Sequence, residues 1–390
     1  MSSQVSRLLR HKLSLKCCNT SRHVATPLRH LATHSRQFAT TPSNFPDSLS
    51  SLSEIEQIVD SPVSFLGIEY LQNEEIFYLL ENIQKLIGTK HPVVEFGAQT
   101  LLGSTGTFKI HGLITLLAAQ IINGSAPTRT EPRDRAGILP KQRRLVEVCE
   151  MVSTAFFLHD NVVSPHKVST EQQHNITKGN KLSLLFGDYF LSTACSQLAS
   201  LEHPKVVDSV SRAIARNVEG RFWLETIEPQ KPPGLADLSY YCSLKHGALM
   251  SSCCYSAALL AGHAKSSEVA TSLQSFGNHV GQAIHLKKEI FAAETNRLGT
   301  ESLSSYPFVA AVLQLSESGR MVDPLTQYND ITVRNVINLG HGVELTYEKC
   351  EQHCAKALDC ITQLKLDEPL ISNLASVILD IKSAKPIFTA

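Results

Sequence analysis

Helical periodicity constrains this chain more than any other feature, and it runs through the sequence from about residue 52 onward. Apolar residues recur every three to four positions, which places them on one face of an α-helix. Few stretches alternate with period two, as a half-buried strand would. The pattern predicts an all-α fold in which helices pack on helices. The expected helices span residues 52–60, 73–87, 92–103, 109–123, 141–160, 178–201, 204–219, 237–262, 267–293, 307–316, 328–339, 345–364 and 367–383.

Three segments interrupt this periodicity and are expected to be loops. They run over residues 123–141, which are rich in Gly, Pro, Thr and mixed charge, over the prolines at 229–233, and over 294–307. No internal repeat is visible, so residues 47–390 are expected to form one helical domain. No run of 18 apolar residues occurs, and the sequence therefore predicts no transmembrane helix.

The first 46 residues differ sharply in charge from the rest of the chain. They hold seven Lys or Arg and no Asp or Glu among many Ser and Thr, which leaves 29 basic against 36 acidic residues in 47–390. An acid-free, Arg- and Ser-rich start is typical of a mitochondrial transit peptide, so residues 1–46 are predicted to direct the chain to the matrix. A disordered basic tail is the alternative. The acidic remainder is a poor candidate for binding nucleic acid.

Ten cysteines are present without a regular spacing. No secretory segment is visible, so they are expected to be reduced and mostly buried thiols. Cys350, His353, Cys354 and Cys360 form the tightest group and could ligate a metal. The alternative is a packing face, because Cys350, Cys354 and Ala357 recur at helical spacing.

Three stretches of the sequence resemble the trans-isoprenyl (polyprenyl) diphosphate synthase family. The segment 150–162 ends in Leu-His-Asp-Asn-Val, the segment 179–191 contains Gly-Asn-Lys and Gly-Asp-Tyr-Phe-Leu, and the segment 276–285 reads Phe-Gly-Asn-His-Val-Gly-Gln-Ala-Ile-His. A weaker match begins at Lys245. This resemblance implies the all-α isoprenoid synthase helical bundle.

The resemblance also implies a reaction that this chain is poorly equipped to perform. Family members join allylic and homoallylic diphosphates, and Mg²⁺ ions held by two aspartate-rich motifs neutralise the leaving diphosphate. Here the first motif reads Asp160, Asn161 and Ser164, so only one of its three carboxylates remains. At the second motif the residues are Lys288 and Glu289. We expect no metal site in this chain, because too few carboxylates remain and a lysine would repel a divalent ion.

The basic residues that would grip diphosphate are also reduced. Where the family carries paired arginines, this chain has Lys109 and His111. Lys245 stands where the family has the lysine of a Lys-Thr-Ala-x-Leu helix. Arginine binds phosphate through a planar fork that Lys and His replace poorly. Lys109, His111 and Lys245 are therefore candidates only for residual diphosphate contacts.

The resemblance together with these losses predicts a non-catalytic or regulatory subunit of a heteromeric enzyme. Its partner would be a catalytic polyprenyl diphosphate synthase subunit, which would hold the Mg²⁺. The resemblance implies that the complex is a heterotetramer that makes the all-trans isoprenoid tail of ubiquinone. The isolated chain is predicted to be inactive. The alternatives are a weakly active synthase that uses Asp160 and Glu289, and an isoprenoid-binding or scaffold protein without a role in prenyl transfer.

Overall fold

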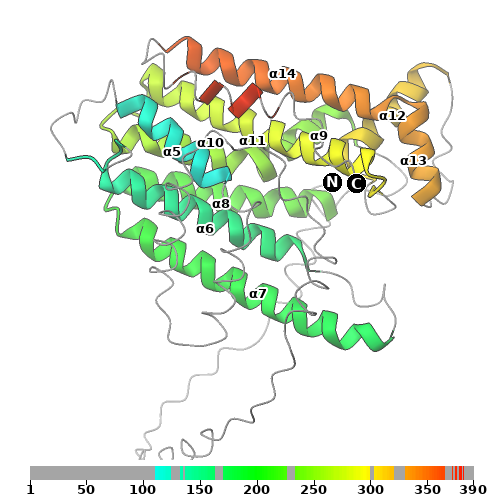
Figure 1. Ribbon diagram of the computed structural model, residues 1–390, viewed down its shortest axis with the longest axis horizontal. Helices are drawn as coiled ribbons and strands as arrows, with labels where there is room; N and C mark the ends of the chain where they lie inside the picture. Colours follow the sequence, from blue (N-terminus) through cyan, green and yellow to red (C-terminus); the bar gives the residue numbers. More distant parts are fainter. Residues whose placement is uncertain are drawn as a thin grey trace, which may run out of the picture. The chain divides into compact units, whose positions relative to one another are not determined.

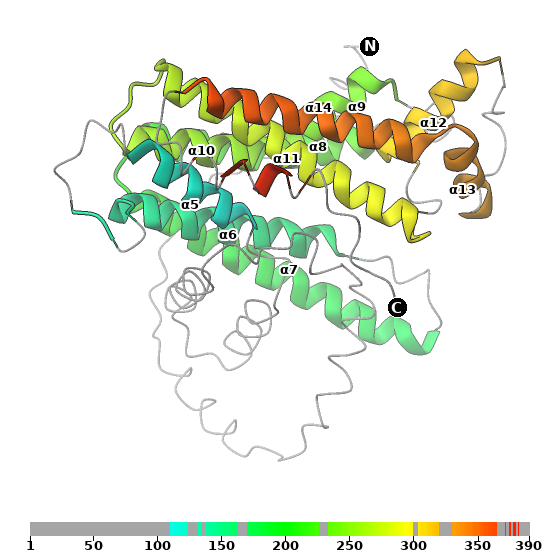
Figure 2. The ribbon, with the colours of Figure 1, turned by 45° about the horizontal axis from the view of Figure 1, so that its top comes forward.

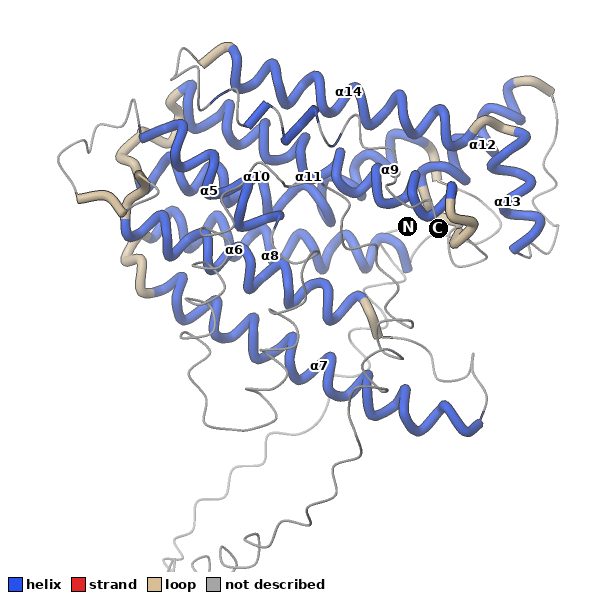
Figure 3. Tube along the Cα trace, in the orientation of Figure 1, coloured by secondary structure: helices blue, strands red, loops and turns tan. Residues whose placement is uncertain are grey.

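The computed structural model confirms the all-α prediction for the part of the chain that it describes. This part comprises residues 110–123, 132–134, 137–162, 170–225, 233–298, 303–319 and 330–364, with residues 371, 374–375, 377–379 and 381. Every regular element within these ranges is helical (Figure 3), and all of them belong to the compact unit Val59–Ala390. The predicted leader and the first three expected helices lie outside the described residues.

The observed helices begin and end within a few residues of most predicted bounds, although the helix expected over 178–201 begins eight residues earlier, at Thr170. In chain order they are α5 (Ile110–Asn123), α6 (Pro140–Asp160), α7 (Thr170–Ala199), α8 (Pro204–Glu225), α9 (Leu235–Cys242), η3 (Ser243–Gly247), α10 (Ala248–Leu260), α11 (Glu268–Glu294), α12 (Tyr306–Glu317), α13 (Asp330–Leu339) and α14 (Gly342–Thr362). The single helix expected over 237–262 consists of three elements, because the π-helical turn η3 separates α9 from α10. Such turns are inserted into α-helices often at functional sites.

Helix α10 lies at the centre of the packing (Figure 1). All of its residues except Ser251 are buried, as expected for a helix that is apolar on every side. It contacts α5, α6, α8 and α11, so the main core forms around it. Burying this much aliphatic surface stabilises the fold at about 25 cal/mol per Å² of apolar area removed from water.

Helix α11 packs between α10 and α14 (Figure 2), and two glycines allow its close approach to α10 and η3. A Cβ atom at Gly277 would lie 2.5 Å from the carbonyl oxygen of Met250, and one at Gly281 would lie 2.3 Å from that of His246. Neither distance is compatible with a side chain. These glycines are spaced one helical turn apart. They therefore let α11 pack directly against α10 and against η3, the turn that carries Lys245 and His246.

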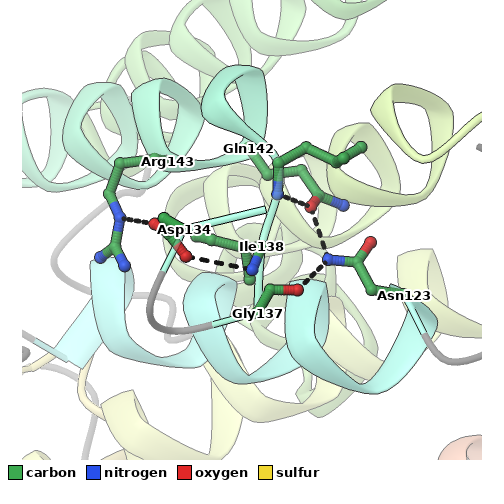
Figure 4. A network of polar contacts seen from close by, with 7 residues as sticks. Asn123, Asp134, Gly137, Ile138, Gln142 and Arg143 are labelled. Atoms are coloured by element: carbon green, nitrogen blue, oxygen red, sulfur yellow. Dashed lines mark hydrogen bonds and ion pairs between the residues drawn. The ribbon is translucent and has the colours of Figure 1, made fainter. Parts of the chain in front are cut away.

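The start of α6 is joined to its neighbours by a buried polar network around Gln142 (Figure 4). The Gln142 Oε1 atom accepts hydrogen bonds from the Leu139 amide and the Asn123 side chain, both at 2.9 Å. Its Nε2 atom donates to the Ala257 carbonyl at 3.0 Å. Gln142 stands at the third position of α6, where a side chain that reaches back to the N-cap amide stabilises a helix start. One residue thus links α5, α6 and α10.

The cysteines behave mostly as predicted. Of the eight that are described, six are buried, and all eight are free thiols. Cys350, Cys354 and Ala357 are each at most 2% exposed, which confirms the packing face on α14. His353 uses its Nδ1 atom to contact Nδ1 of His279 on α11, at 3.0 Å. Across the described residues, no helix is both long and apolar enough to span a bilayer.

Candidate functional site

The remaining carboxylate of the first motif is held by two cations of the same chain. Asp160 is the last residue of α6, and its carboxylate forms an ion pair with Arg221 of α8. The Lys245 ammonium group of η3 lies 3.7 Å from its second oxygen. Both side chains that form the ion pair are about one third exposed. The negative charge that a divalent ion would need is therefore already matched by protein groups.

The other members of the first motif contribute little that could bind a ligand. Asn161 is the C-cap residue of α6, and its side-chain amide donates to the Phe157 carbonyl at 2.7 Å. This hydrogen bond satisfies one of the carbonyls that a helix end leaves free. Ser164 lies outside the described residues. Of the first motif, only Asp160 presents a carboxylate.

Glu289 has a structural role in the second motif. Its Oε2 atom accepts a hydrogen bond from the Tyr306 amide at 2.9 Å, and Tyr306 is the first residue of α12. Its Oε1 atom lies 3.3 Å from Nε2 of His285. A carboxylate at a helix N-terminus is stabilised by the free amides and the helix dipole, so Glu289 joins α11 to α12.

The two lysines before Glu289 differ in their surroundings. Lys287 is only 3% exposed, and its ammonium group lies 4.8 Å from the centre of the Tyr347 ring, which is a cation–π contact with α14. Solvent reaches Lys288, although the protein around its ammonium group lowers its pKa through burial, against the opposing effect of Glu150. Lys288 is therefore the lysine of this motif that faces the other charged groups of the site.

Lys245 connects the two degenerate motifs electrostatically. Its ammonium group contacts Asp160, and the negative charge of Glu289 acts to raise its pKa. Burial, followed by the nearby Arg221 charge, lowers the pKa of Lys245 to about 8, against the opposing effect of Glu289. The sequence predicted a residual diphosphate contact for this lysine, and the structure places it beside the carboxylate of Asp160. Its role as a diphosphate contact stays a prediction.

Replacing Lys245 with methionine should change how stability depends on pH. An unfolded lysine binds its proton up to about pH 10.5, whereas the folded one releases it near pH 8. The unfolded state therefore binds more protons between these values, and wild-type stability rises with pH in this window. Relative to Lys245→Met, the wild-type free energy of unfolding should rise by about 2 kcal/mol from pH 8 to pH 10. Urea unfolding at several pH values measures this; a constant difference between the two proteins would contradict it.

Three histidines and Lys288 form a second group, which we call the imidazole–lysine cluster: His111, His246, His285 and Lys288. The rings of His246 and His285 are stacked with centroids 3.5 Å apart. His111 extends from α5, and its Nδ1 atom lies 2.8 Å from the Ser153 hydroxyl of α6. Burial and the Lys288 charge lower the pKa of His111 to about 3. Burial, followed by His285 and the lysines 245 and 288, holds the pKa of His246 well below its usual value.

The arrangement does not fit the Mg²⁺ ions that the two motifs hold in the family. Mg²⁺ requires near-octahedral oxygen ligands, but here Asp160 is paired with two cations and Glu289 caps a helix. Within the described ranges, no three His, Cys, Asp or Glu side chains come together as a metal site would need. Repulsion by Lys245 and Lys288 adds to this mismatch.

Several groups that define the site were missed by sequence reasoning. Arg221 stands in an amphipathic helix without a motif, and only the fold brings it to Asp160. His246 and His285 lie within the matched segments, but their stacking required the glycine contacts between α11 and η3. The Nε2 atom of His159, beside Asp160 on α6, lies 3.2 Å from Oδ1 of Asp188 of α7. Lys109 lies outside the described residues.

Comparison with known proteins agrees with this architecture. The sequence model of the family described as Polyprenyl synthetase matches residues 99–287. The chain is 26% identical over 327 residues to all trans-polyprenyl-diphosphate synthase PDSS2 of Homo sapiens, with 80% of this chain and 81% of the relative covered. It is 25% identical to the mitochondrial solanesyl-diphosphate synthase 1 of Oryza sativa subsp. japonica, with 75% and 71% covered.

The solved structures define the fold class. The crystal structure of a decaprenyl diphosphate synthase from Rhodobacter capsulatus superposes with a TM-score of 0.64 at 18% identity, covering 80% of this chain and 96% of that one. The fold is thus that of the all-α isoprenoid synthases. Within this class, the chain is similar in sequence to polyprenyl diphosphate synthases.

Proposed function

We propose that this chain is a non-catalytic subunit of a heteromeric all-trans-polyprenyl diphosphate synthase that makes the isoprenoid tail of ubiquinone in the mitochondrial matrix. The proposal is carried by one observation: the carboxylate of Asp160 is paired with Arg221 and Lys245. The similarity to PDSS2 and to mitochondrial solanesyl-diphosphate synthase supports the tail-synthesis role and the location.

The physical argument concerns charge development in the reaction. Cleavage of an allylic C–O bond transfers a negative charge to the leaving diphosphate, and each 1.4 kcal/mol of lost stabilisation costs about tenfold in rate. A unit charge pair at about 4 Å is worth roughly 4 kcal/mol at an effective dielectric constant near 20. A site whose carboxylates are engaged by Arg221, Lys245 and the start of α12 therefore cannot assemble the metal ions that would stabilise this charge. The catalytic subunit would hold them instead.

The test compares the chain alone, its catalytic homologue alone, and both together, each with Mg²⁺ and with allylic and homoallylic diphosphates. We expect no elongation from the lone chain and more long-chain product from the mixture than from the homologue. The matched variant is Asp160→Asn in this chain, which should leave the activity of the mixture unchanged within about twofold. The same substitution in an active aspartate motif costs several kcal/mol of transition-state stabilisation.

Each result separates the proposal from its alternatives. Elongation by the lone chain, or its loss in the mixture after Asp160→Asn, would identify a weakly active synthase. Absence of any stimulation, together with failure of the two chains to co-purify, would favour a scaffold or isoprenoid-binding protein.

A further inference from the structure

A side chain of α8 holds the π-helical turn η3 from outside. Asn217 of α8 donates its side-chain amide to the Lys245 carbonyl at 2.8 Å, and Asn217 is only 5% exposed. Proteins use π turns rarely, mostly as single turns inserted into α-helices. A buried hydrogen bond to a carbonyl of the turn helps to stabilise this uncommon conformation. Asn217 therefore acts on η3 at the residue whose side chain reaches Asp160.

The same part of α8 lies very close to the turn. A Cβ atom at Gly220 would lie 3.2 Å from Cβ of Lys245 and 3.3 Å from its amide nitrogen. The next residue, Arg221, forms the ion pair with Asp160. Asn217 and Arg221 are four positions apart, so they share one face of the helix. This face of α8 thus supplies one cation to Asp160 and holds the turn that supplies the other.

Helix α11 fixes other residues of the turn. The Ser243 hydroxyl donates to Oδ1 of Asn278 at 3.0 Å, and Gly281 lies so close to the His246 carbonyl oxygen that a Cβ atom would not fit. These contacts act on the residues on either side of Lys245 in the sequence. The backbone of Lys245 itself is held by Asn217, so its position depends on α8.

The π turn determines the direction of the Lys245 side chain. Such a turn adds one residue to a regular α-helix, in which each residue corresponds to a rotation of about 100°. If η3 relaxed to a regular helix, Lys245 would therefore rotate by up to about 100° relative to α9 or α10. Its ammonium group now lies 3.7 Å from the Asp160 carboxylate, and such a rotation would not preserve this contact.

We infer that Asn217 is a positioning residue, which fixes the π turn through the Lys245 carbonyl and so directs the Lys245 ammonium group to the Asp160 carboxylate. The inference deepens the proposed function and rests on it in one respect, because the pairing of Asp160 carries that proposal. It adds a residue of α8 that acts on the pair through the backbone of η3.

The protonation of Lys245 reports where its side chain lies. Burial, followed by the charge of Arg221, lowers the pKa of Lys245 to about 8. A side chain that turned away toward solvent would lose both effects, and its pKa would rise toward the ordinary lysine value of 10.5. The charged and titratable groups around Lys245 are Asp160 of α6, Arg221 of α8, Tyr241 and Cys242 of α9, and Glu289 of α11.

The experiment is competitive labelling of the lysine amines of the full chain with acetic anhydride over a range of pH, with the Lys245 peptide quantified by mass spectrometry. In the wild type its labelling should have a midpoint near pH 8. Asn217→Leu keeps most of the volume and removes the donor. We expect the midpoint to rise by about one unit or more, so that the unprotonated fraction at pH 8 falls about fivefold or more. Asn217→Ala removes the donor without steric misfit and should act in the same direction.

Thr346→Val is the matched control for general loss of stability. Thr346 is fully buried and donates its hydroxyl to the Gly342 carbonyl within α14, so this variant also loses a buried hydrogen bond but should leave the Lys245 midpoint unchanged. An unchanged or lowered midpoint in both Asn217 variants, or an equal rise in Thr346→Val, would overturn the inference and leave the proposed function standing. Elongation by the lone chain would overturn the proposed function without changing the labelling result.

Discussion

Gly277→Ala should destabilise the protein by about 3 kcal/mol or more, although alanine is the better helix former. The new Cβ atom would lie 2.5 Å from the Met250 carbonyl oxygen and 2.8 Å from Cα of Ser251. Both are backbone atoms, so no side-chain rotation can make room, and α11 would have to move away from α10. Overpacking of this kind typically costs 1–3 kcal/mol, and more where the backbone must shift.

The chain provides a matched control for this prediction. Gly179 lies within α7, and a Cβ atom there would meet nothing within 4 Å. Gly179→Ala should therefore stabilise the protein by about 0.5–1 kcal/mol through helix propensity and the lower entropy of the unfolded chain. Urea unfolding followed by the fluorescence of the single tryptophan, Trp223, measures both variants. If Gly277→Ala proved as stable as wild type, the close helix contact would be wrong.

The helices and their main breaks were predictable from the sequence because they depend on local patterns. The apolar repeat predicted α14, and the buried Cys350, Cys354 and Ala357 confirm its inner face. The sequence also identified Asp160 and Glu289 as the two carboxylates left in the motifs. Both carboxylates could be identified because a motif is defined by residue identity and spacing, which the sequence shows directly.

The charge pairing within the site was not predictable, since it depends on contacts between distant segments. Arg221 lies 61 residues after Asp160 in the sequence, and no motif relates the two. One partner of Glu289 is a backbone amide, which leaves no trace in residue identity. The π-helical turn at Lys245 depends on how α9 and α10 join. The motifs therefore indicated which carboxylates were missing, and the tertiary structure shows which groups pair with the two that remain.

The ion pairs of Asp160 with Arg221 and Lys245 join the end of α6 to α8 and η3. Both cations belong to the same chain as the carboxylate. Their contribution to stability is modest, since the Asp160 and Arg221 side chains are partly exposed and screened by solvent. The fold must therefore be stabilised mainly by its core and by buried polar links.

Gln142→Ala should test the largest of these buried links, with an expected loss of about 3–4 kcal/mol. The substitution leaves the Leu139 amide, the Asn123 side-chain amide and the Ala257 carbonyl without their partner. Gln142 is fully buried, so water cannot replace it without opening the junction, and each unsatisfied group costs about 1–3 kcal/mol. Part of this loss is relieved where the Asn123 amide keeps its hydrogen bond to the Gly137 carbonyl at 2.9 Å.

The control for Gln142→Ala is Gln352→Ala on the exposed face of α14, which should change stability by less than about 0.5 kcal/mol. Both variants are compared by urea unfolding, and hydrogen exchange locates the effect. Because Gln142 joins the ends of α5 and α10 to the start of α6, amides at these three places should exchange faster in Gln142→Ala, while those of α13 should not change. A uniform increase in exchange across α13 as well would mean that the loss is global and that Gln142 does not act as a local link.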